Sequence, residues 1–179
     1  MGNRRGNSLI EFTLVGIPLI FVLISIFEMA RWAWTYHTLA YSMKEGVRYA
    51  IVHGTNCSIA PNSCYVTIRD ISRKIADAGV GLDLSLLTNV TFTSATRTLT
   101  CSTLQACLAG GSAGSTVWPA LPPGSTGYPD EGGNAGSEIR ITAQYPFSSA
   151  ISMLWPGAKG SVVFGTYTFP ASSSEGIQY

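Results

Sequence analysis

LIEFTLVGIPLIFVLISIF, residues 9–27, is the longest apolar run in the chain and carries a single charge, at Glu11. At about 1.5 Å per residue, an α-helix of this length covers roughly the 30 Å hydrocarbon thickness of a bilayer. A carboxylate on such a helix costs on the order of 2.5–3.5 kcal/mol at the bilayer centre and less toward the ends, so its presence indicates a function. The alternative is that an acid in the first helical turn offsets the helix dipole.

Two arginines and a glycine precede this run. Arg4 and Arg5 are followed by Gly6, and Glu11 is the fifth residue after that glycine. The arrangement resembles the processing site of type IV pilins and pseudopilins, which a prepilin peptidase cuts after a glycine. More narrowly, RRGNSLIEF at residues 4–12 resembles the start of TadE-like proteins, which are pseudopilins of the tight-adherence (Tad) pilus system. The resemblance is close in the amino-terminal part of the chain and holds only in outline beyond it.

The resemblance implies a minor pilin or pseudopilin that is cut between Gly6 and Asn7. Glu11 would then pair with the new terminal amine of a neighbouring subunit, so that neither charge is left uncompensated during assembly. The implied partners are a prepilin peptidase, other pilins or pseudopilins, an inner-membrane assembly platform and membrane lipid. The implied role is in pilus biogenesis and surface adherence. The expected parts are a leader peptide (1–6), a transmembrane segment (7–28) and an exported α+β domain (29–179).

Charge sets the expected orientation of the span. Arg4 and Arg5 lie directly before it, so the amino terminus is expected in the cytoplasm and the carboxy-terminal domain in the periplasm or outside the cell. Together with the resemblance, this predicts a single-pass protein of the bacterial inner membrane, and the sequence leaves open whether the subunit enters the pilus or remains in the membrane. An uncleaved signal anchor with an exported binding domain is the alternative. A secretory signal peptide fits less well, because its apolar region is about 7–15 residues long and ends at a small-residue cleavage site.

Four cysteines follow the span, on the side that is expected to be oxidising. They are Cys57, Cys64, Cys101 and Cys107, and they allow three pairings. The short separations favour one disulfide between Cys57 and Cys64 and another between Cys101 and Cys107. A zinc site is the alternative, but neither spacing is the usual separation of about two to four residues.

The helical pattern continues beyond the span. Apolar residues recur at steps of three and four along one face, at Met29, Trp32, Tyr36, Leu39, Met43, Gly46 and Ala50. This pattern predicts one long helix to about His53, half in lipid and half packed on the domain. Pro18 should bend the membrane half, because it removes a backbone donor and clashes with the preceding turn. Trp32, Trp34 and Tyr36 are placed for an interfacial aromatic belt.

A second helix and a sheet are expected in the exported domain. The helix is predicted from about Tyr65 to Ala78, with Asn62 or Ser63 as its cap and with one apolar face. Strands are predicted at residues 89–100, 138–145 and 161–169, in one antiparallel sheet with one face on the helices. EIRITAQYPF, residues 138–147, resembles a strand that recurs in TadE-like proteins. The predicted fold class is therefore α+β and pilin-like.

Residues 109–137 form a long stretch that is dense in Gly, Ser and Pro. A structureless loop of this length is uncommon inside a compact domain and is usually functional or disordered. Trp118, Leu121 and Tyr128 give it apolar anchors, so part of it is expected to fold back as a flap. Oxygen ligands for Ca²⁺ are available at Asp130, Glu131, Asn134 and Glu138. They fit no EF-hand pattern and are better read as a solvated turn, so no metal site is predicted.

Composition argues against nucleic-acid binding and catalysis. Charged residues make up 12% of the chain and the net charge is +1, without a basic tract. The histidines, His37 and His53, have no nucleophile and acid in a recognisable arrangement. No P-loop, dinucleotide fingerprint or HExxH motif occurs. We therefore expect no enzyme, no cofactor, no small-molecule substrate and no nucleic-acid partner.

Overall fold

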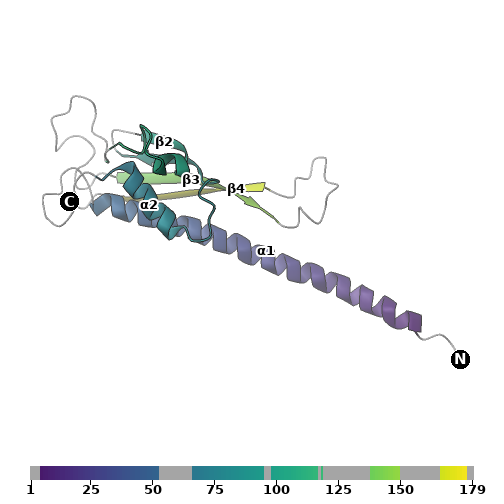
Figure 1. The fold of residues 1–179 in the computed structure, drawn as a ribbon. Helices are drawn as coiled ribbons and strands as arrows, with labels where there is room; N and C mark the ends of the chain where they lie inside the picture. The colour runs from purple at the N-terminus through teal and green to yellow at the C-terminus, as the bar shows by residue number, and fades with distance from the viewer. Residues whose placement is uncertain are drawn as a thin grey trace, which may run out of the picture. The chain divides into compact units, whose positions relative to one another are not determined.

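Helices and one sheet make up the described part of the chain. The computed structural model describes residues 5–52, 66–94, 98–116, 118, 138–149 and 166–176 (Figure 1). The elements in chain order are α1 (Arg5–Val52), α2 (Ile68–Ala78), β1 (Thr88–Thr93), β2 (Thr98–Thr103), α3 (Leu104–Leu108), β3 (Glu138–Ser148) and β4 (Thr166–Gly176). The chain forms two compact units, the first Met1–Trp34 with Ser148–Thr166 and the second Thr35–Phe147 with Tyr167–Tyr179. The predicted α+β class is confirmed.

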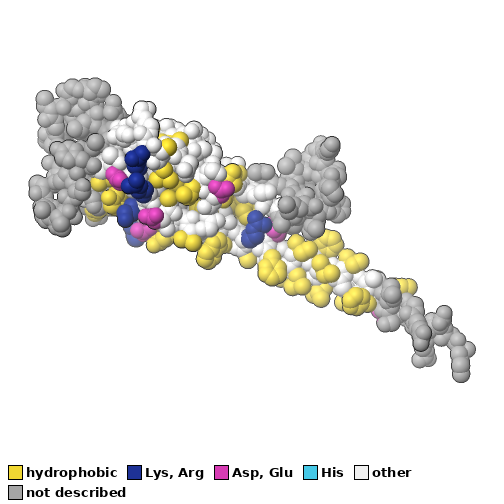
Figure 2. Space-filling model, viewed as in Figure 1, with side chains coloured by type: hydrophobic (Ala, Val, Ile, Leu, Met, Phe, Trp, Pro, Cys, Tyr) yellow, Lys and Arg dark blue, Asp and Glu magenta, His cyan; other side chains and the backbone are white. Residues whose placement is uncertain are grey.

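In the first unit, α1 is a continuous helix that passes through Pro18. Its apolar side chains face outward, and Phe12, Leu14 and Phe27 are exposed by 76%, 71% and 71%. Figure 2 shows an apolar surface along this part of the helix. The helix is long and apolar enough to cross a membrane. The helix continues unbroken on both sides of Pro18. Its bounds do not test whether the axis bends there, so the predicted bend stays a prediction.

In the second unit, the same helix buries one stripe of small and apolar residues. The stripe consists of Leu39, Ser42, Met43, Gly46, Val47, Ala50 and Ile51. Of the earlier positions of the predicted stripe, Tyr36 is 42% exposed and lies edge-on to Phe169 at 6.0 Å, while Met29 and Trp32 belong to the first unit and are exposed by 73% and 45%. The helix is described to Val52, and His53 lies outside the described residues. The part of α1 that belongs to the second unit therefore packs on the domain, as the sequence predicted for the carboxy-terminal half of the helix.

Gly46 lets α1 and α2 approach closely. A Cβ atom at Gly46 would lie 2.5 Å from Cγ1 of Ile75 in α2 and 3.5 Å from Cδ1 of Ile141 in β3. Ile68, Ile71 and Ile75 are the buried apolar residues of α2, which confirms its predicted apolar face. The core of the second unit therefore lies between these two helices and one face of the sheet.

α2 begins later than predicted. Thr67 is its N-cap: the Thr67 hydroxyl accepts from the Asp70 amide at 3.3 Å, and the Asp70 carboxylate accepts from the Thr67 amide at 3.0 Å. This capping box satisfies two amides that a helix start leaves without helical partners. The predicted caps, Asn62 or Ser63, lie outside the described residues. Those caps and the start at Tyr65 are wrong, because the reciprocal pair fixes the first turn later in the chain.

Four strands form one sheet in the order β2-β1-β3-β4. β1 and β2 form an antiparallel hairpin in which Thr93 is opposite Thr98. The single strand predicted over residues 89–100 is therefore wrong, because the chain reverses between these two threonines. β1 also pairs antiparallel with β3, with Phe92 opposite Ile141.

β3 and β4 extend beyond their predicted ends. β3 continues through Pro146 to Ser148, and β4 runs from Thr166 to Gly176. The earlier part of the third predicted strand, residues 161–165, lies outside the described residues. The predicted alternation of β3 is confirmed, because the side chains on one face are buried, at Ile139, Ile141, Ala143 and Tyr145.

Candidate functional site

The predicted processing bond lies in the first turn of α1. The backbone is helical from Arg5, so Gly6 and Asn7 already belong to the helix. The first four amides of a helix have no acceptor within it, so this turn opens more easily than the helix interior. The bond between Gly6 and Asn7 thus lies in the part of α1 whose unwinding requires the least free energy. Arg4 lies outside the described residues, and the orienting role of Arg4 and Arg5 stays a prediction.

Glu11 lies on the surface of α1, four residues after Asn7. At a rise of about 1.5 Å per residue, the two positions are about 6 Å apart along the helix axis. At 3.6 residues per turn they are also about 40° apart around it. A charge on the amine of Asn7 and a charge on Glu11 would therefore lie on the same side of the helix.

The two hydroxyl groups between residues 10 and 27 are satisfied within the helix. Thr13 Oγ1 donates to the carbonyl oxygen of Ile10 at 3.0 Å, and Ser25 Oγ donates to that of Phe21 at 2.8 Å. Such back-bonding lets a hydroxyl sit in hydrocarbon at low cost. An ionised carboxylate such as that of Glu11 is costlier in an apolar environment than a hydroxyl, and a cationic partner lowers this cost.

Arg31 joins two parts of the first unit directly after the predicted span. Its Nη1 donates to Oε1 of Glu28 at 3.1 Å, and its Nη2 donates to the carbonyl oxygen of Ser148 at 3.1 Å. The Glu28 side chain is 13% exposed and that of Arg31 is 54% exposed. The end of β3 is thereby tied to α1 three residues beyond the last residue of the predicted transmembrane segment.

The segment after α3 packs on the start of α2. The amides of Ile68 and Arg69 donate to the carbonyl oxygens of Thr116 and Gly114, each at 3.0 Å. Arg69 Nε also donates to the carbonyl oxygen of Leu108, at 3.0 Å, where α3 ends. Together with the capping box, these contacts satisfy the first amides of α2 and the last carbonyl of α3.

Trp118 anchors this segment, as predicted. Its side chain is fully buried, its ring lies 6.0 Å from that of Phe92, and its amide donates to the carbonyl oxygen of Val66 at 2.7 Å. Leu121 and Tyr128 lie outside the described residues. The described start of the predicted loop is therefore a structural part of the second unit.

A disulfide joins Cys101 and Cys107, as their spacing predicted. The two Cα atoms are 5.8 Å apart, and the side chains are 4% and 0% exposed. The bond ties α3 to β2 directly before the segment that caps α2. Cys57 and Cys64 lie outside the described residues, so their pairing stays a prediction.

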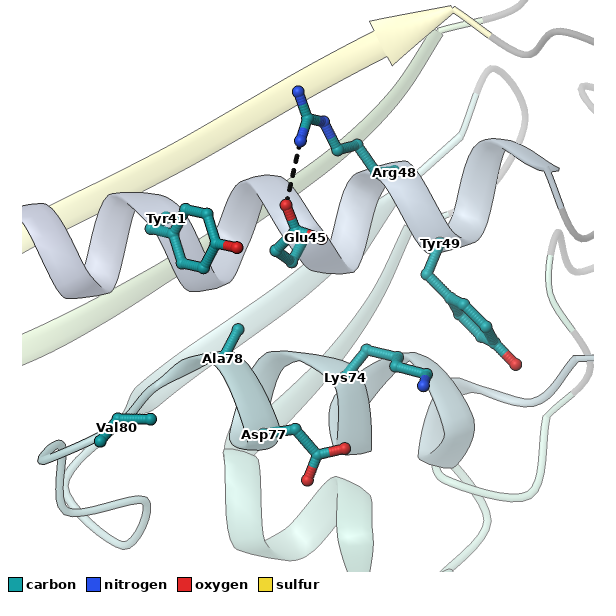
Figure 3. A pocket seen from close by; sticks show the side chains of 8 residues that line it. All are labelled: Tyr41, Glu45, Arg48, Tyr49, Lys74, Asp77, Ala78 and Val80. Carbon is teal, nitrogen blue, oxygen red and sulfur yellow. Dashed lines mark hydrogen bonds and ion pairs between the residues drawn. The ribbon is translucent and has the colours of Figure 1, made fainter.

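An open groove of about 570 Å³ lies between α1 and α2 in the second unit (Figure 3). Arg48 donates to Glu45 at 3.0 Å, and Lys74 Nζ lies 5.4 Å from the ring centroid of Tyr49. Burial, and then the negative charge of Asp70, raises the pKa of Tyr49. Two pairs of lining side chains therefore interact across or along the groove, and the lining residues include no nucleophile with an adjacent base. Sequence reasoning missed the groove because residues of two separate helices build it.

The histidines and acids give no metal centre in the described ranges. His37 is exposed on α1, and His53 is not described. Within those ranges, no three His, Cys, Asp or Glu side chains are grouped to hold a metal ion. Of the oxygen ligands considered for Ca²⁺, Glu138 pairs with Arg140 at 3.0 Å, and the other three lie outside the described part.

Comparison with known families matches the amino-terminal region. The model of the TadE-like protein family matches residues 6–48. This range includes Gly6, Glu11 and the apolar run, so the resemblance seen in the sequence is confirmed there. No curated protein matches the chain. No solved structure matches it either.

Proposed function

We propose that this chain, whose residues 6–48 match the TadE-like protein family, is a minor pilin or pseudopilin of a Tad-type type IV pilus. The observation that carries the proposal is the place of Glu11. It is the one ionisable side chain between residues 10 and 27, and it follows Gly6 by five residues. Because the family consists of structural subunits, the proposed role is in pilus biogenesis and surface adherence, without catalysis.

The first proposed step is insertion and processing. Arg4 and Arg5 stay on the cytoplasmic side, as the positive-inside rule requires. A prepilin peptidase of the inner membrane then cuts between Gly6 and Asn7. The new terminal amine is positive and lies about 6 Å along the helix axis from Glu11. Processing thus gives the start of the span one positive and one negative charge.

The second proposed step is assembly with other pilins on an inner-membrane platform. The exposed apolar side chains of α1 leave lipid and pack against the helices of neighbouring subunits. Glu11 then faces the terminal amine of a neighbour. Breaking a buried ion pair costs about 3–5 kcal/mol, because it leaves an uncompensated charge. A subunit shifted along the fibre axis would leave Glu11 without this amine and would be less stable by that amount. The ion pair therefore fixes the axial position of each subunit in the fibre.

Intact-mass measurement tests the processing step. We expect the protein purified from cells with an active prepilin peptidase to begin at Asn7. A Gly6→Leu variant provides the control and should keep its full length, because the peptidase cuts after glycine in the pilins that this site resembles. A wild-type chain that begins at Met1 or Gly2 would overturn the proposal. It would favour an uncleaved signal anchor with an exported binding domain.

A further inference from the structure

The groove between α1 and α2 lies entirely within the second unit, and its two walls carry side chains in the same order. Figure 3 shows these side chains as rows across the groove, each with one residue from either wall. They are an apolar row of Tyr41 and Val80, an acidic row of Glu45 and Asp77, and a basic row of Arg48 and Lys74. The groove therefore changes from apolar through negative to positive along its length.

The direction of the two helices explains this order. A Cβ atom at Gly46 would lie 2.5 Å from Cγ1 of Ile75, and Lys74 Nζ lies 5.4 Å from the ring centroid of Tyr49. The later residue of α1 thus meets the earlier residue of α2, so the two helices run in opposite directions here. The acidic lining residue precedes the basic one on α1 and follows it on α2. Like charges therefore come level with each other across the groove.

The charges of the two walls do not compensate each other across the groove. Glu45 and Arg48 pair along α1, at 3.0 Å, and are 31% and 53% exposed. Lys74 and Asp77 are exposed on α2, and neither forms an ion pair with another residue of the described ranges. Each charged row thus has an excess of one sign. A partner with a charge of the opposite sign at each row would relieve this excess.

The apolar row offers a different kind of contact at one end of the groove. Tyr41 is 55% exposed and Val80 is 68% exposed, although both are largely apolar side chains. Covering them with an apolar side chain would remove this surface from water, which is favourable. A complementary partner therefore has an apolar group at this end and two charges beyond it.

The spacing of the rows matches a helix. Along α1 the rows are separated by four and then three residues, or about 6 Å and 4.5 Å at about 1.5 Å per residue. A partner helix presents side chains on one face at the same two steps. The side chains on one face of a strand recur at roughly 6.6–6.8 Å, so an extended segment would match only one of the two spacings. A helix can also lie in the groove between two packed helices.

We propose that the groove binds a helix of a partner protein that presents an apolar, a basic and an acidic side chain, in this order from the apolar row to the basic row. The basic side chain lies between the two carboxylates of the acidic row, and the acidic side chain lies between the two cations of the basic row. The order of the charges therefore determines binding, and net charge does not. The contact goes beyond the proposed function. It requires neither cleavage after Gly6 nor the pairing of Glu11, so it holds or fails independently of the pilin proposal.

Two synthetic peptides of identical composition test the contact. Each is a helix of about 20 alanine and glutamine residues, long enough to form a helix in water, with three guest residues at steps of four and three. The matched peptide carries Leu, Arg and Glu in this order, and the control peptide carries Leu, Glu and Arg. Fluorescence anisotropy of the labelled peptides measures their binding to the full chain in detergent micelles. Because the compositions are the same, binding to the micelle affects both peptides alike.

The matched peptide is expected to bind at least about tenfold more tightly than the control peptide. Exchanging its two charges turns attractive contacts with both charged rows into repulsive ones. The preference should disappear in about 1 M salt, where the Debye length is about 3 Å. Equal affinity of the two peptides at low salt, or binding of neither, would overturn the proposal.

Exchanging the charges of the groove gives the reciprocal test. The variant Glu45→Arg/Arg48→Glu/Lys74→Asp/Asp77→Lys keeps the net charge and should prefer the control peptide by a similar factor. A cooperative thermal transition shows that it is folded. A folded variant that keeps the wild-type preference would overturn the proposal.

A single substitution tests the apolar row without changing the charged rows. Val80→Arg should weaken the matched peptide several-fold, because a charge would then be covered by the leucine of the peptide. Leu86→Arg is the matched control, since Leu86 is also an exposed apolar residue of the second unit, at 43%, but does not line the groove. It should bind the matched peptide like the wild type. Equal binding by Val80→Arg and Leu86→Arg would contradict the proposed position of the helix.

Discussion

Arg31 and Ser148 are 117 residues apart in the sequence, and a hydrogen bond of 3.1 Å joins the guanidinium of one to the backbone carbonyl of the other. The same guanidinium donates to Glu28, whose side chain is 13% exposed. One side chain thus positions the end of β3 and compensates a largely buried carboxylate. Because the acceptor at Ser148 is a backbone oxygen, the contact depends on the residue at position 31.

Arg31→Ala is expected to lower the free energy of unfolding by about 1–2 kcal/mol, because a hydrogen bond to a charged group contributes about 1.5–3 kcal/mol and the Arg31 side chain is 54% exposed. Arg48→Ala is the matched control. Arg48 is 53% exposed and pairs with Glu45 at 3.0 Å, like Arg31 with Glu28, but Glu45 is more exposed, at 31%. The control should lose no more than about 0.5 kcal/mol. Denaturant unfolding of the full chains in detergent measures both, and equal losses would contradict the role of Arg31.

Gly46→Ala tests the close approach of α1 and α2. The new methyl would lie 2.5 Å and 2.9 Å from two side-chain carbons of Ile75, so either that side chain or one of the helices must shift. Overpacking of this kind costs about 1–3 kcal/mol, partly offset by the gain of about 0.5–1 kcal/mol from replacing a helical glycine. We therefore expect a lower melting temperature.

Two further variants complete the Gly46 test. Gly46→Ala/Ile75→Val should recover part of the loss, because the shorter side chain removes the nearest contact. Gly16→Ala is the control, since its methyl would meet only the ring of Phe12, at 3.8 Å. It should leave the melting temperature of the second unit unchanged. A stable Gly46→Ala single variant would show that the helices are not packed at this distance.

Cys101→Ser/Cys107→Ser is expected to destabilise the second unit by about 2 kcal/mol, which the chain-entropy relation gives for so short a loop. Both cysteines are buried, so the unmodified protein should resist reduction until it unfolds. Thermal unfolding of the double variant, beside the oxidised wild type, measures the loss. A matched Cys57→Ser/Cys64→Ser variant separates the two predicted disulfides. Unchanged stability of Cys101→Ser/Cys107→Ser would show that the disulfide between β2 and α3 does not stabilise the second unit.

The carboxyl of Asp70 makes part of the folding stability dependent on pH. The hydroxyl of Thr67 donates to its carboxylate at 2.6 Å and is the largest cause of a pKa below the ordinary value of 3.8, with the Thr67 amide and Arg73 adding to it. A carboxyl with a lowered folded pKa contributes stability that is fully present above the unfolded pKa. This contribution is lost as pH falls through the folded pKa. The contribution of Asp70 should therefore be complete above about pH 4 and fade below it.

Asp70→Asn should flatten the fall in stability below about pH 4, because the amide does not titrate. Asp77→Asn, on the same helix but outside the capping box, controls for the lost charge. Unfolding by urea at a series of pH values gives both profiles. The same slope in wild type and Asp70→Asn would rule out a titrating capping box.

Elements set by local periodicity were predictable. The buried face of β3 and the carboxy-terminal stripe of α1 follow directly from spacings of two and of three to four residues. The hairpin of β1 and β2 was missed because residues 88–103 are rich in threonine throughout and contain no Asn-Gly or Asp-Gly turn signal. The start of α2 could have been found, since Thr67 followed by Asp70 has the spacing of a capping box.

Contacts between distant residues had no such signal. Arg69 donates to the carbonyl oxygen of Leu108, 39 residues later, and no local pattern selects that acceptor. The contact of Arg31 with Ser148 is of the same kind. Glu11 is the opposite case, because the cost of a charge in an apolar run can be read from the sequence alone. The position of Glu11 in an apolar run is therefore visible in the sequence, while its role stays a prediction.

Glu11→Gln distinguishes the two hypotheses for the Glu11 carboxylate, which are pairing with the terminal amine of a neighbour and offsetting the helix dipole. The amide keeps the size of the side chain, removes its charge and costs less in lipid, so insertion and cleavage should be unchanged. If the acid pairs with the amine of a neighbour, the variant should remain in the membrane fraction and be lost from sheared filaments. Glu11→Asp keeps the charge and should retain part of the incorporation. If the acid only offsets the helix dipole, the change costs about 0.3–1 kcal/mol, and Glu11→Gln would reach filaments at the wild-type level. Immunoblots of the two fractions decide between these outcomes.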